Sequence, residues 1–206
     1  MARARGWVKE LHASKGIVYQ LKVSLRDIRP PVWRRLLVLD STDLHQLHLI
    51  IQDAMGWTNS HFYEFTIGSA RFQRTASRDL GFTPTEEAAS AILGQLSPPV
   101  GRRFAYWYDF GDDWFHDILV EKALSAETGA VYPRCTGGKR ACPPEDCGGP
   151  YGYADFLEAI SDPKHPEHAE FLEWVGGSFD PRAFDLAEAD AALVAAYGQR
   201  WKGTGK

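Results

Sequence analysis

Apolar residues occupy every second position along residues 17–26, as Ile17, Tyr19, Leu21, Val23 and Leu25. This period of two is typical of a strand that buries one face. Two prolines follow in DIRPPV, where the missing N–H groups interrupt strand pairing, and VWRRLLVL then resumes with β-branched and aliphatic residues. The pattern predicts two strands, at 17–26 and 32–39, joined by a proline turn.

A helical spacing replaces the alternation in the next segment. Apolar side chains and one histidine recur three or four residues apart, as Leu44, Leu47, His48, Ile51 and Met55. Ser41 or Thr42 is suited to cap this helix, and Gly56 is suited to end it. A histidine in such a stripe is more often a packed, hydrogen-bonded core residue than a ligand, so we assign His48 to no site.

Shorter alternating segments continue the β pattern. Residues 61–68 predict a strand with a hairpin partner near 71–74. The polar, proline-interrupted residues 75–100 predict one short helix at most. Residues 102–124 alternate on both sides of a Gly-Asp turn, and they predict a β-hairpin.

The last third of the chain has helical spacing. Residues 153–160, 166–175 and 185–198 predict helices, and Asp185 and Glu188 have the spacing of a capping box. The order of elements predicts an α+β fold. Its mainly antiparallel sheet comes from about the first 125 residues, with a packed helix, and a helical C-terminal third follows.

The chain has no fixed-period repeat and no long low-complexity linker, so we expect a single folded domain at 17–198. This domain includes a loop rich in Cys, Gly and Pro at 126–150 and a helical part at 151–198. A basic extension at 1–16 precedes the domain, and a tail at 199–206 follows it. A separate helical subdomain at the C-terminal end is the alternative.

Charge is distributed unevenly along the chain. The 206 residues carry a formal net charge of −4, yet residues 1–35 hold nine Lys or Arg against two acids. Residues 109–190 hold eighteen acids against six bases. The basic end indicates an anionic partner, which we expect to be DNA or another protein. The other interpretation is a solvated strand face whose bases pair with acids elsewhere in the fold.

The expected location follows from segments that the sequence lacks and from its cysteines. The sequence has no run of about 18 apolar residues, and its first residues have no apolar core that would serve as a secretory signal. Its three cysteines, an odd number, fit reduced thiols better than a disulfide framework. We therefore expect a cytoplasmic protein without membrane contact.

Cys135, Cys142 and Cys147 lie in a segment, 134–153, that is too rich in Gly and Pro to predict a helix or a strand. Structural zinc sites use thiolate and imidazole ligands, usually four. We predict a structural zinc at the three thiols with His116 as the fourth ligand. Other candidates for that fourth position are His165, His168, Glu145 and Asp146. The other interpretation is three buried thiols without a metal, because free cysteine is among the most buried residue types.

A second group of chemically active residues is Asp109, Asp112, Asp113 and Asp117. Carboxylates this close together can hold Mg²⁺ or Ca²⁺, and two-metal nucleases use such clusters. The same string, DFGDD, has the composition of a hairpin turn, and we favour the turn. A serine nucleophile finds no support because the G-x-S-x-G motif is absent, and the acids and prolines beside the cysteines indicate raised thiol pKa values.

Four strings together resemble the plasmid pRiA4b ORF-3-like family: VSLRDIRPPVWRRLLV, LHQLHLIIQDAMGWTNSHFYEF, YDFGDDWFHDILVE and YPRCTGGKRACPPEDCGGPYGYADFLEAI. The resemblance extends from about Ile17 to Tyr197. Proteins of this family are also found as passengers in insertion sequences, some under a resolvase-like label. The resemblance therefore implies an association with mobile elements and no established reaction. No serine of this chain lies in the motif of serine recombinases.

The residues and the resemblance together favour a non-enzymatic accessory or binding protein. It would serve a mobile element or its host, contact DNA or another protein through residues 1–35, and contain the structural zinc. The alternative is a metal-dependent hydrolase or nuclease that uses the Asp109–Asp117 cluster with His116.

Overall fold

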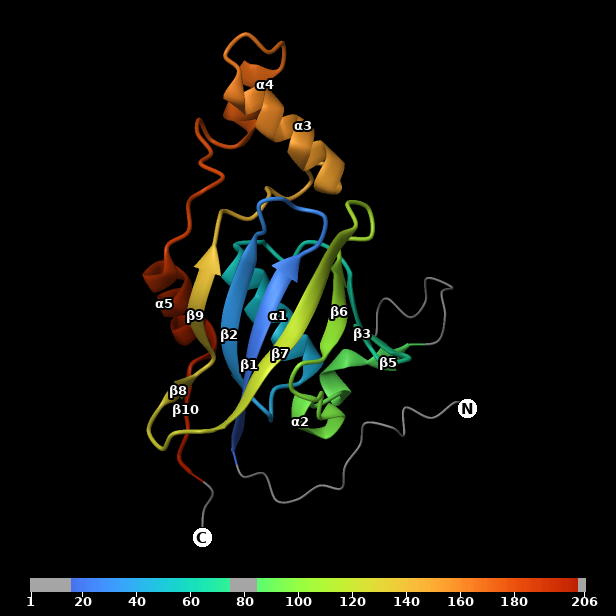
Figure 1. The fold of residues 1–206 in the computed structure, drawn as a ribbon, viewed down its shortest axis with the longest axis vertical. Helices are drawn as coiled ribbons and strands as arrows, with labels where there is room; N and C mark the ends of the chain where they lie inside the picture. The colour runs from blue at the N-terminus through green and yellow to red at the C-terminus, as the bar shows by residue number, and fades with distance from the viewer. Residues whose placement is uncertain (1–15, 75–84, 204–206) are drawn as a thin grey trace.

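An eight-stranded sheet organises the chain, whose structure, a computed structural model, describes residues 16–74 and 85–203 (Figure 1). The elements are β1 (Ile17–Leu25), β2 (Trp33–Leu39), α1 (Leu44–Met55), β3 (Tyr63–Ile67), β4 (Ala70–Gln73), β5 (Glu86–Glu87), η2 (Ala88–Ser90), α2 (Leu93–Leu96), β6 (Arg103–Tyr108), β7 (Trp114–Ser125), β8 (Val131–Tyr132), β9 (Arg134–Lys139), α3 (Gly149–Ser161), α4 (His168–Trp174), α5 (Leu186–Tyr197) and β10 (Gln199–Arg200). The strand order is β5-β4-β3-β6-β7-β1-β2-β9, and β8 and β10 form a separate small sheet.

The two faces of the large sheet have different surroundings. In Figure 1 the sheet faces the viewer and α1 crosses behind it. Leu21 and Val23 of β1 are fully buried in the core that includes α1. The alternate residues Gln20, Lys22 and Ser24 point to the opposite side and are only half-buried. No helix of the described residues crosses that side of β1, β2, β6 and β7, which we call the open face.

The first predicted elements are confirmed, with one correction at the helix start. β1 and β2 pair in antiparallel register. Asp43, rather than Ser41 or Thr42, caps α1, because its Oδ1 accepts a hydrogen bond from the Gln46 amide at 2.8 Å. The Gln46 side chain accepts from the Asp43 amide in return, which completes a capping box. Gly56 ends the helix in the left-handed conformation at φ +90°, as predicted.

The later hairpins are also confirmed. β6 and β7 pair antiparallel across the Gly-Asp turn, and β3 pairs with β4. The region predicted to hold one short helix contains η2 and α2, while its residues 75–84 lie outside the described part of the chain. Among the strands that the structure describes, only β4 and β5 pair in parallel, so the sheet is mixed but mainly antiparallel.

The prediction that 126–150 is only a loop is wrong, because β8 and β9 lie within it. β9 pairs with β2, and Cys135 lies opposite Leu36. Glycine fits this strand because a side chain at Gly138 would come within 2.4 Å of the Phe184 ring. The predicted tail also begins with a strand, since β10 pairs with β8.

The α+β class is confirmed, but a division into a sheet followed by a helical third is not. α1 and α2 precede the C-terminal helices, and three strands follow residue 125. Asp185 caps α5 by accepting from the Ala187 and Glu188 amides at 2.8 and 3.0 Å. α5 is tied to β9, because Asp190 accepts a hydrogen bond from the Cys135 amide at 2.9 Å. In the described residues, no helix is long and apolar enough to cross a membrane.

The first turn of α3 permits a stability test at Gly149. Its φ is +70°, and an added Cβ would lie 2.2 Å from the Asp112 carbonyl oxygen. We expect Gly149→Ala to lower the free energy of unfolding by about 3–5 kcal/mol in urea denaturation. Gly101→Ala is the matched control, because Gly101 has φ +83° but no atom within 4 Å of the added Cβ. The control should lose only about 1–2 kcal/mol, and equal losses would contradict this explanation.

Candidate functional site

A closed ring of hydrogen bonds fixes the loop between α1 and β3. Gln52 Nε2 donates to the Tyr106 hydroxyl at 2.9 Å, and that hydroxyl lies 2.7 Å from His48 Nδ1. His48 Nε2 lies 2.6 Å from Asn59 Oδ1, and the Asn59 amide donates back to Gln52 Oε1 at 3.2 Å. Because Asn59 Oδ1 only accepts, His48 carries its proton on Nε2 and accepts from Tyr106 at Nδ1. The prediction of His48 as a hydrogen-bonded core residue is confirmed.

The same loop anchors the cysteine segment through Glu145. The Thr58 amide donates to Glu145 Oε2 at 2.8 Å, the Thr58 hydroxyl donates to the same oxygen, and the Tyr108 hydroxyl donates to Oε1 at 2.5 Å. Trp57 Nε1 donates to the Pro143 carbonyl at 3.0 Å. Burial alone would raise the Glu145 pKa, but the hydrogen bonds from Thr58 and Tyr108 outweigh it and lower that pKa. These hydrogen bonds hold the cysteine segment against the loop between α1 and β3 and against β6.

The three predicted thiol ligands lie in different parts of this segment. Cys135 is in β9, where its thiol approaches the Gly137 carbonyl at 3.6 Å, while Cys142 and Cys147 lie in the stretch that leads to α3. Burial raises the pKa of all three thiols, to about 12 for Cys147. The thiols therefore lack the depressed pKa that favours a nucleophile. The structure does not gather them with His116 into one group of ligand atoms within 4.8 Å, and the structural zinc stays a prediction.

His116, the predicted fourth ligand, is completely buried in β7. Its Nδ1 lies 3.0 Å from the Trp114 carbonyl oxygen, and its ring meets the Trp57 ring edge-on. Burial lowers the His116 pKa to about 3, so the ring is neutral. Nε2 has no hydrogen-bond partner among the described residues.

The four aspartates of the DFGDD region are separated by the hairpin. Asp109 Oδ1 accepts from the Gly111 and Asp112 amides at 2.9 and 3.3 Å, which confirms the turn interpretation. Asp112 accepts from the Gly148 amide at 3.0 Å. Asp117 lies on the open face and pairs with Arg26 at 2.6 Å. Strand alternation places Asp117 on the opposite side of β7 from His116, so these residues do not build the predicted hydrolase site.

Asp109 instead joins a histidine and an aspartate from other segments. His61 Nε2 lies 3.5 Å from Asp109 Oδ2 and 3.0 Å from Asp146 Oδ1. Among the described residues, these three form the group of His, Cys, Asp or Glu side chains whose ligand atoms all lie within 4.8 Å of one another. The sequence predicts Asp146 only as an alternative zinc ligand, and it predicts no ligand role for His61.

A cavity of about 400 Å³ opens beside this group. His61 and Asp109 line it, together with Asn59, Ser60, Arg74 and other residues of the turn and of β3. The cavity lining therefore combines the positive charge of Arg74, the imidazole of His61, the carboxylate of Asp109 and the hydroxyl of Ser60. A polar or charged small ligand is the kind that such a lining can hold.

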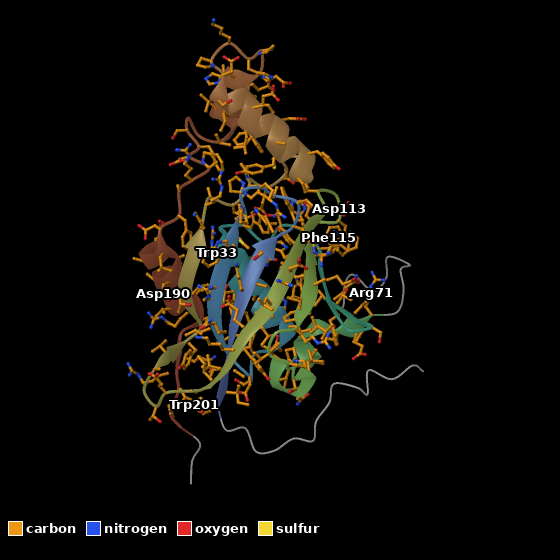
Figure 2. The ribbon with its side chains drawn as sticks, in the orientation of Figure 1. Trp33, Arg71, Asp113, Phe115, Asp190 and Trp201 are labelled. Carbon is orange, nitrogen blue, oxygen red and sulfur yellow. The ribbon has the colours of Figure 1, made fainter. Side chains whose placement is uncertain are left out.

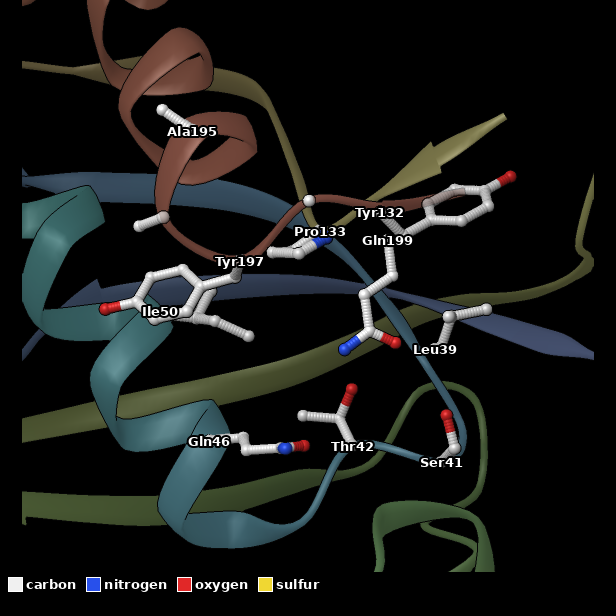
Figure 3. Close-up of a pocket in the computed structure, with 12 residues that line it drawn as sticks. Leu39, Ser41, Thr42, Gln46, Ile50, Tyr132, Pro133, Ala195, Tyr197 and Gln199 are labelled. Atoms are coloured by element: carbon white, nitrogen blue, oxygen red, sulfur yellow. The ribbon is translucent and has the colours of Figure 1, made fainter. Parts of the chain in front are cut away.

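A second cavity, of about 340 Å³, lies between α1, α5 and β8 (Figure 3). Thr42, Gln46 and Gln199 provide its polar groups, and Tyr197 lies across from them. Its lining contains no Asp, Glu, His, Cys, Lys or Arg. It offers no set of metal ligands and no charge for an ionic ligand.

The open face carries aromatic rings from three strands of the sheet. Trp107 of β6 stacks on Phe115 of β7 at 5.0 Å, and Trp33 lies on β2, beyond β1. Figure 2 shows Trp33 and Phe115 near the same end of the sheet. All three side chains are half-buried, and the Trp107 ring also packs against the Phe110 ring at 4.3 Å.

Bases flank these rings on the open face. Lys22 lies 4.9 Å and Arg35 5.0 Å from the centre of the Trp33 ring, and Arg26 lies 5.9 Å from that of Phe115. Arg26 pairs with Asp117 and Arg35 pairs with Glu121, as the solvated-face interpretation of the basic end predicts.

The remaining bases of residues 1–35 are placed differently. Arg34 points into the protein and is 3% exposed. Arg29 lies in the proline turn, and its side chain donates to the Ile28 carbonyl at 3.3 Å. The predicted basic extension lies almost entirely in residues 1–15, outside the described part of the chain.

Comparisons with known proteins agree with one another. The sequence model of a family described as "Plasmid pRiA4b ORF-3-like protein" matches residues 17–188. "Uncharacterized protein y4hQ" of Sinorhizobium fredii is 40% identical over 177 residues, which are 85% of this chain and 90% of that protein. A crystal structure of a protein of unknown function, MM3350 from Methanosarcina mazei Go1, is similar with a TM-score of 0.75 and 35% identity. The similarity covers 84% of this chain and 96% of that one.

Proposed function

This chain belongs to the plasmid pRiA4b ORF-3-like family, and we propose that it is a non-enzymatic binding protein that holds single-stranded nucleic acid on its open face. In this role it would act as an accessory protein of a mobile element or its host. The observation that carries the proposal is the row of half-buried aromatic rings, two of them, Trp33 and Phe115, beside bases, on a sheet face that no described helix covers.

The spacing of the rings suits more than one base. Trp107 and Phe115 face each other on β6 and β7, and Trp33 lies two strands beyond Phe115. Neighbouring strands are about 4.8 Å apart, so Trp107 and Trp33 are about 14 Å apart across the strands. The register also places Trp33 level with Asp117, two residues along from Phe115. Sheets with exposed aromatic residues bind single-stranded RNA in this way, with two or three bases stacked on the rings.

The charges on the open face support a strand with phosphates. Arg26 and Asp117 are each 40% exposed, and surface ion pairs of this kind contribute little to stability. A phosphate can therefore replace the carboxylate beside Arg26 at small cost. Lys22 and Arg103 add positive charge to the same face.

The first test measures binding of fluorescein-labelled oligothymidylate by fluorescence anisotropy. We expect Trp33→Ala to weaken binding by about 5- to 150-fold, the loss of one stacked base. Trp174→Ala is the control, because Trp174 is a 46% exposed tryptophan on α4, away from the sheet face. Lys22→Gln should lower the slope of log affinity against log salt by about 0.7.

Three outcomes would contradict the proposal. The first is absence of binding to oligothymidylate and to the matching RNA at low salt. The second is an equal effect of Trp33→Ala and Trp174→Ala. The third is a clear preference for duplex DNA, which would move the contact from stacking rings to the bases of residues 1–35.

A further inference from the structure

We propose that His61, Asp109 and Asp146 bind a divalent cation of the Mn²⁺ or Zn²⁺ class at the mouth of the cavity beside the turn. This inference is independent of nucleic-acid binding at the open face. It also differs from the zinc predicted at the cysteines, with which it shares only Asp146 as a candidate ligand.

Three separate segments bring the ligand atoms together. His61 lies just before β3, Asp109 directly after β6, and Asp146 in the cysteine segment. The Nε2 atom of His61 is 3.0 and 3.5 Å from the nearest oxygens of the two carboxylates. Ligands at about 2.1 Å from one tetrahedral cation lie about 3.4 Å from one another, so these atoms are already near the required spacing.

The surroundings fix two of the ligands. Asp109 is 5% exposed, and its Oδ1 is held by two backbone amides of the turn, which leaves Oδ2 directed at His61. The Asp109 amide donates to the Phe62 carbonyl at 2.9 Å, which ties the turn to the residue after His61. The His61 ring meets the Tyr108 ring edge-on at 5.8 Å. Because Asp109 and His61 are already held in place, less conformational freedom is lost when they bind a metal ion.

The hydrogen bonding of the His61 Nε2 atom is a further observation. The His61 side chain is 28% exposed, but its Nε2 atom is shielded from solvent and, although it lies 3.0 Å from Asp146 Oδ1, makes no hydrogen bond of acceptable geometry within the described residues. A buried polar atom without a partner is unusual and needs an explanation. A cation between the imidazole and the carboxylates provides one.

The ligand set indicates the class of cation. One imidazole with two carboxylates suits Mn²⁺ and Zn²⁺ better than Ca²⁺, which takes six to eight oxygens. Three protein ligands leave at least one coordination position open, and the cavity of about 400 Å³ adjoins it. Arg74 lines the same cavity, so an anionic group such as a phosphate or carboxylate could occupy the open position.

The test uses untagged full-length protein that has been treated with chelator and dialysed. Mn²⁺ binding is followed by electron paramagnetic resonance and Zn²⁺ binding by calorimetry. We expect one site, with His61→Gln and Asp146→Asn each weakening Mn²⁺ binding by at least about 10-fold. Asp146 is 70% exposed, so its substitution should leave the fold intact. Asp109→Asn retains the oxygen that accepts the turn amides, and it should also weaken binding.

Asp113→Asn is the matched control, because Asp113 is an exposed aspartate of the same turn outside the ligand group. It should bind Mn²⁺ like the unaltered protein, and circular dichroism melting checks that every variant is folded. Absence of Mn²⁺ and Zn²⁺ binding would overturn the proposal, as would full binding by His61→Gln. Zinc binding that is lost in Cys142→Ser but kept in His61→Gln would assign the metal to the thiols instead.

Discussion

Arg34→Met should lower the free energy of unfolding by about 3–5 kcal/mol. The Arg34 guanidinium is 3% exposed and donates to the Ala54 and Trp33 carbonyls at 2.7 and 2.9 Å. A longer bond reaches the Lys139 carbonyl at 3.3 Å, and the group lies 4.1 Å from the Phe184 ring centre. Methionine fills part of the volume but leaves these carbonyls without donors. Urea denaturation at neutral pH measures the loss.

The neighbouring arginine is the matched control for this substitution. Arg35 points to the open face, where its ion pair with Glu121 is partly exposed. Surface pairs contribute about 1 kcal/mol or less, so Arg35→Met should be nearly neutral. Similar losses in the two variants would show that Arg34 does not connect α1, β2 and β9 in the way its contacts indicate.

Acid should destabilise the fold below about pH 6.5, because two buried histidines must remain neutral. Burial lowers the pKa of His48 and of His116 to about 3, from about 6.5 in the unfolded chain. Both contributions are complete above pH 6.5 and are lost as the pH falls toward 3. At pH 4.5 each histidine has lost about 3 kcal/mol relative to pH 7. Urea midpoints at the two pH values measure the difference.

His48→Gln separates the two histidines. Glutamine cannot be protonated in this range, so the variant should lose about half of the pH dependence that the two histidines contribute, whatever its stability at pH 7. His165→Gln is the control, because His165 lies outside the core in the turn before α4. A stability that is flat between pH 7 and 4.5 in the unaltered protein would contradict the assignment of His48 and His116 as buried neutral residues.

Local sequence patterns correctly predict most of the strands and the long helix in the first half of the chain. Alternation predicted β1, β2 and the β6–β7 hairpin, because each strand buries one face and exposes the other. The helical stripe predicted α1 within a residue or two. Its cap was misplaced because Ser41, Thr42 and Asp43 are all good caps, and the choice depends on which of them lies three residues before Gln46.

Strand β9 could not be predicted from its own residues. Arg134, Cys135 and Thr136 are followed by two glycines, a composition that indicates a loop. The strand forms because β2 offers a free edge and because the Phe184 ring takes the space that a side chain at Gly138 would fill. Phe184 lies almost fifty residues later in the chain, so no local pattern contains this information.

The candidate metal group was only partly visible in the sequence. The sequence predicts Asp109 and Asp146 as candidate metal ligands with other partners, and it places His61 only at the start of a strand. Their proximity follows from the β3–β6 register, which places Tyr63 opposite Tyr108, and from the bonds of Glu145 to Thr58 and Tyr108. Both are contacts between distant segments, which spacing along the chain does not reveal.

The hydrogen-bond ring of Gln52, Tyr106, His48 and Asn59 runs in one direction only, since each member gives one proton to the next. Removing any one member leaves two others with an unmet donor or acceptor. The four bonds therefore depend on one another and do not act as four independent contacts. Asn59 belongs to the ring through its backbone amide, so the ring also positions the chain two residues before His61.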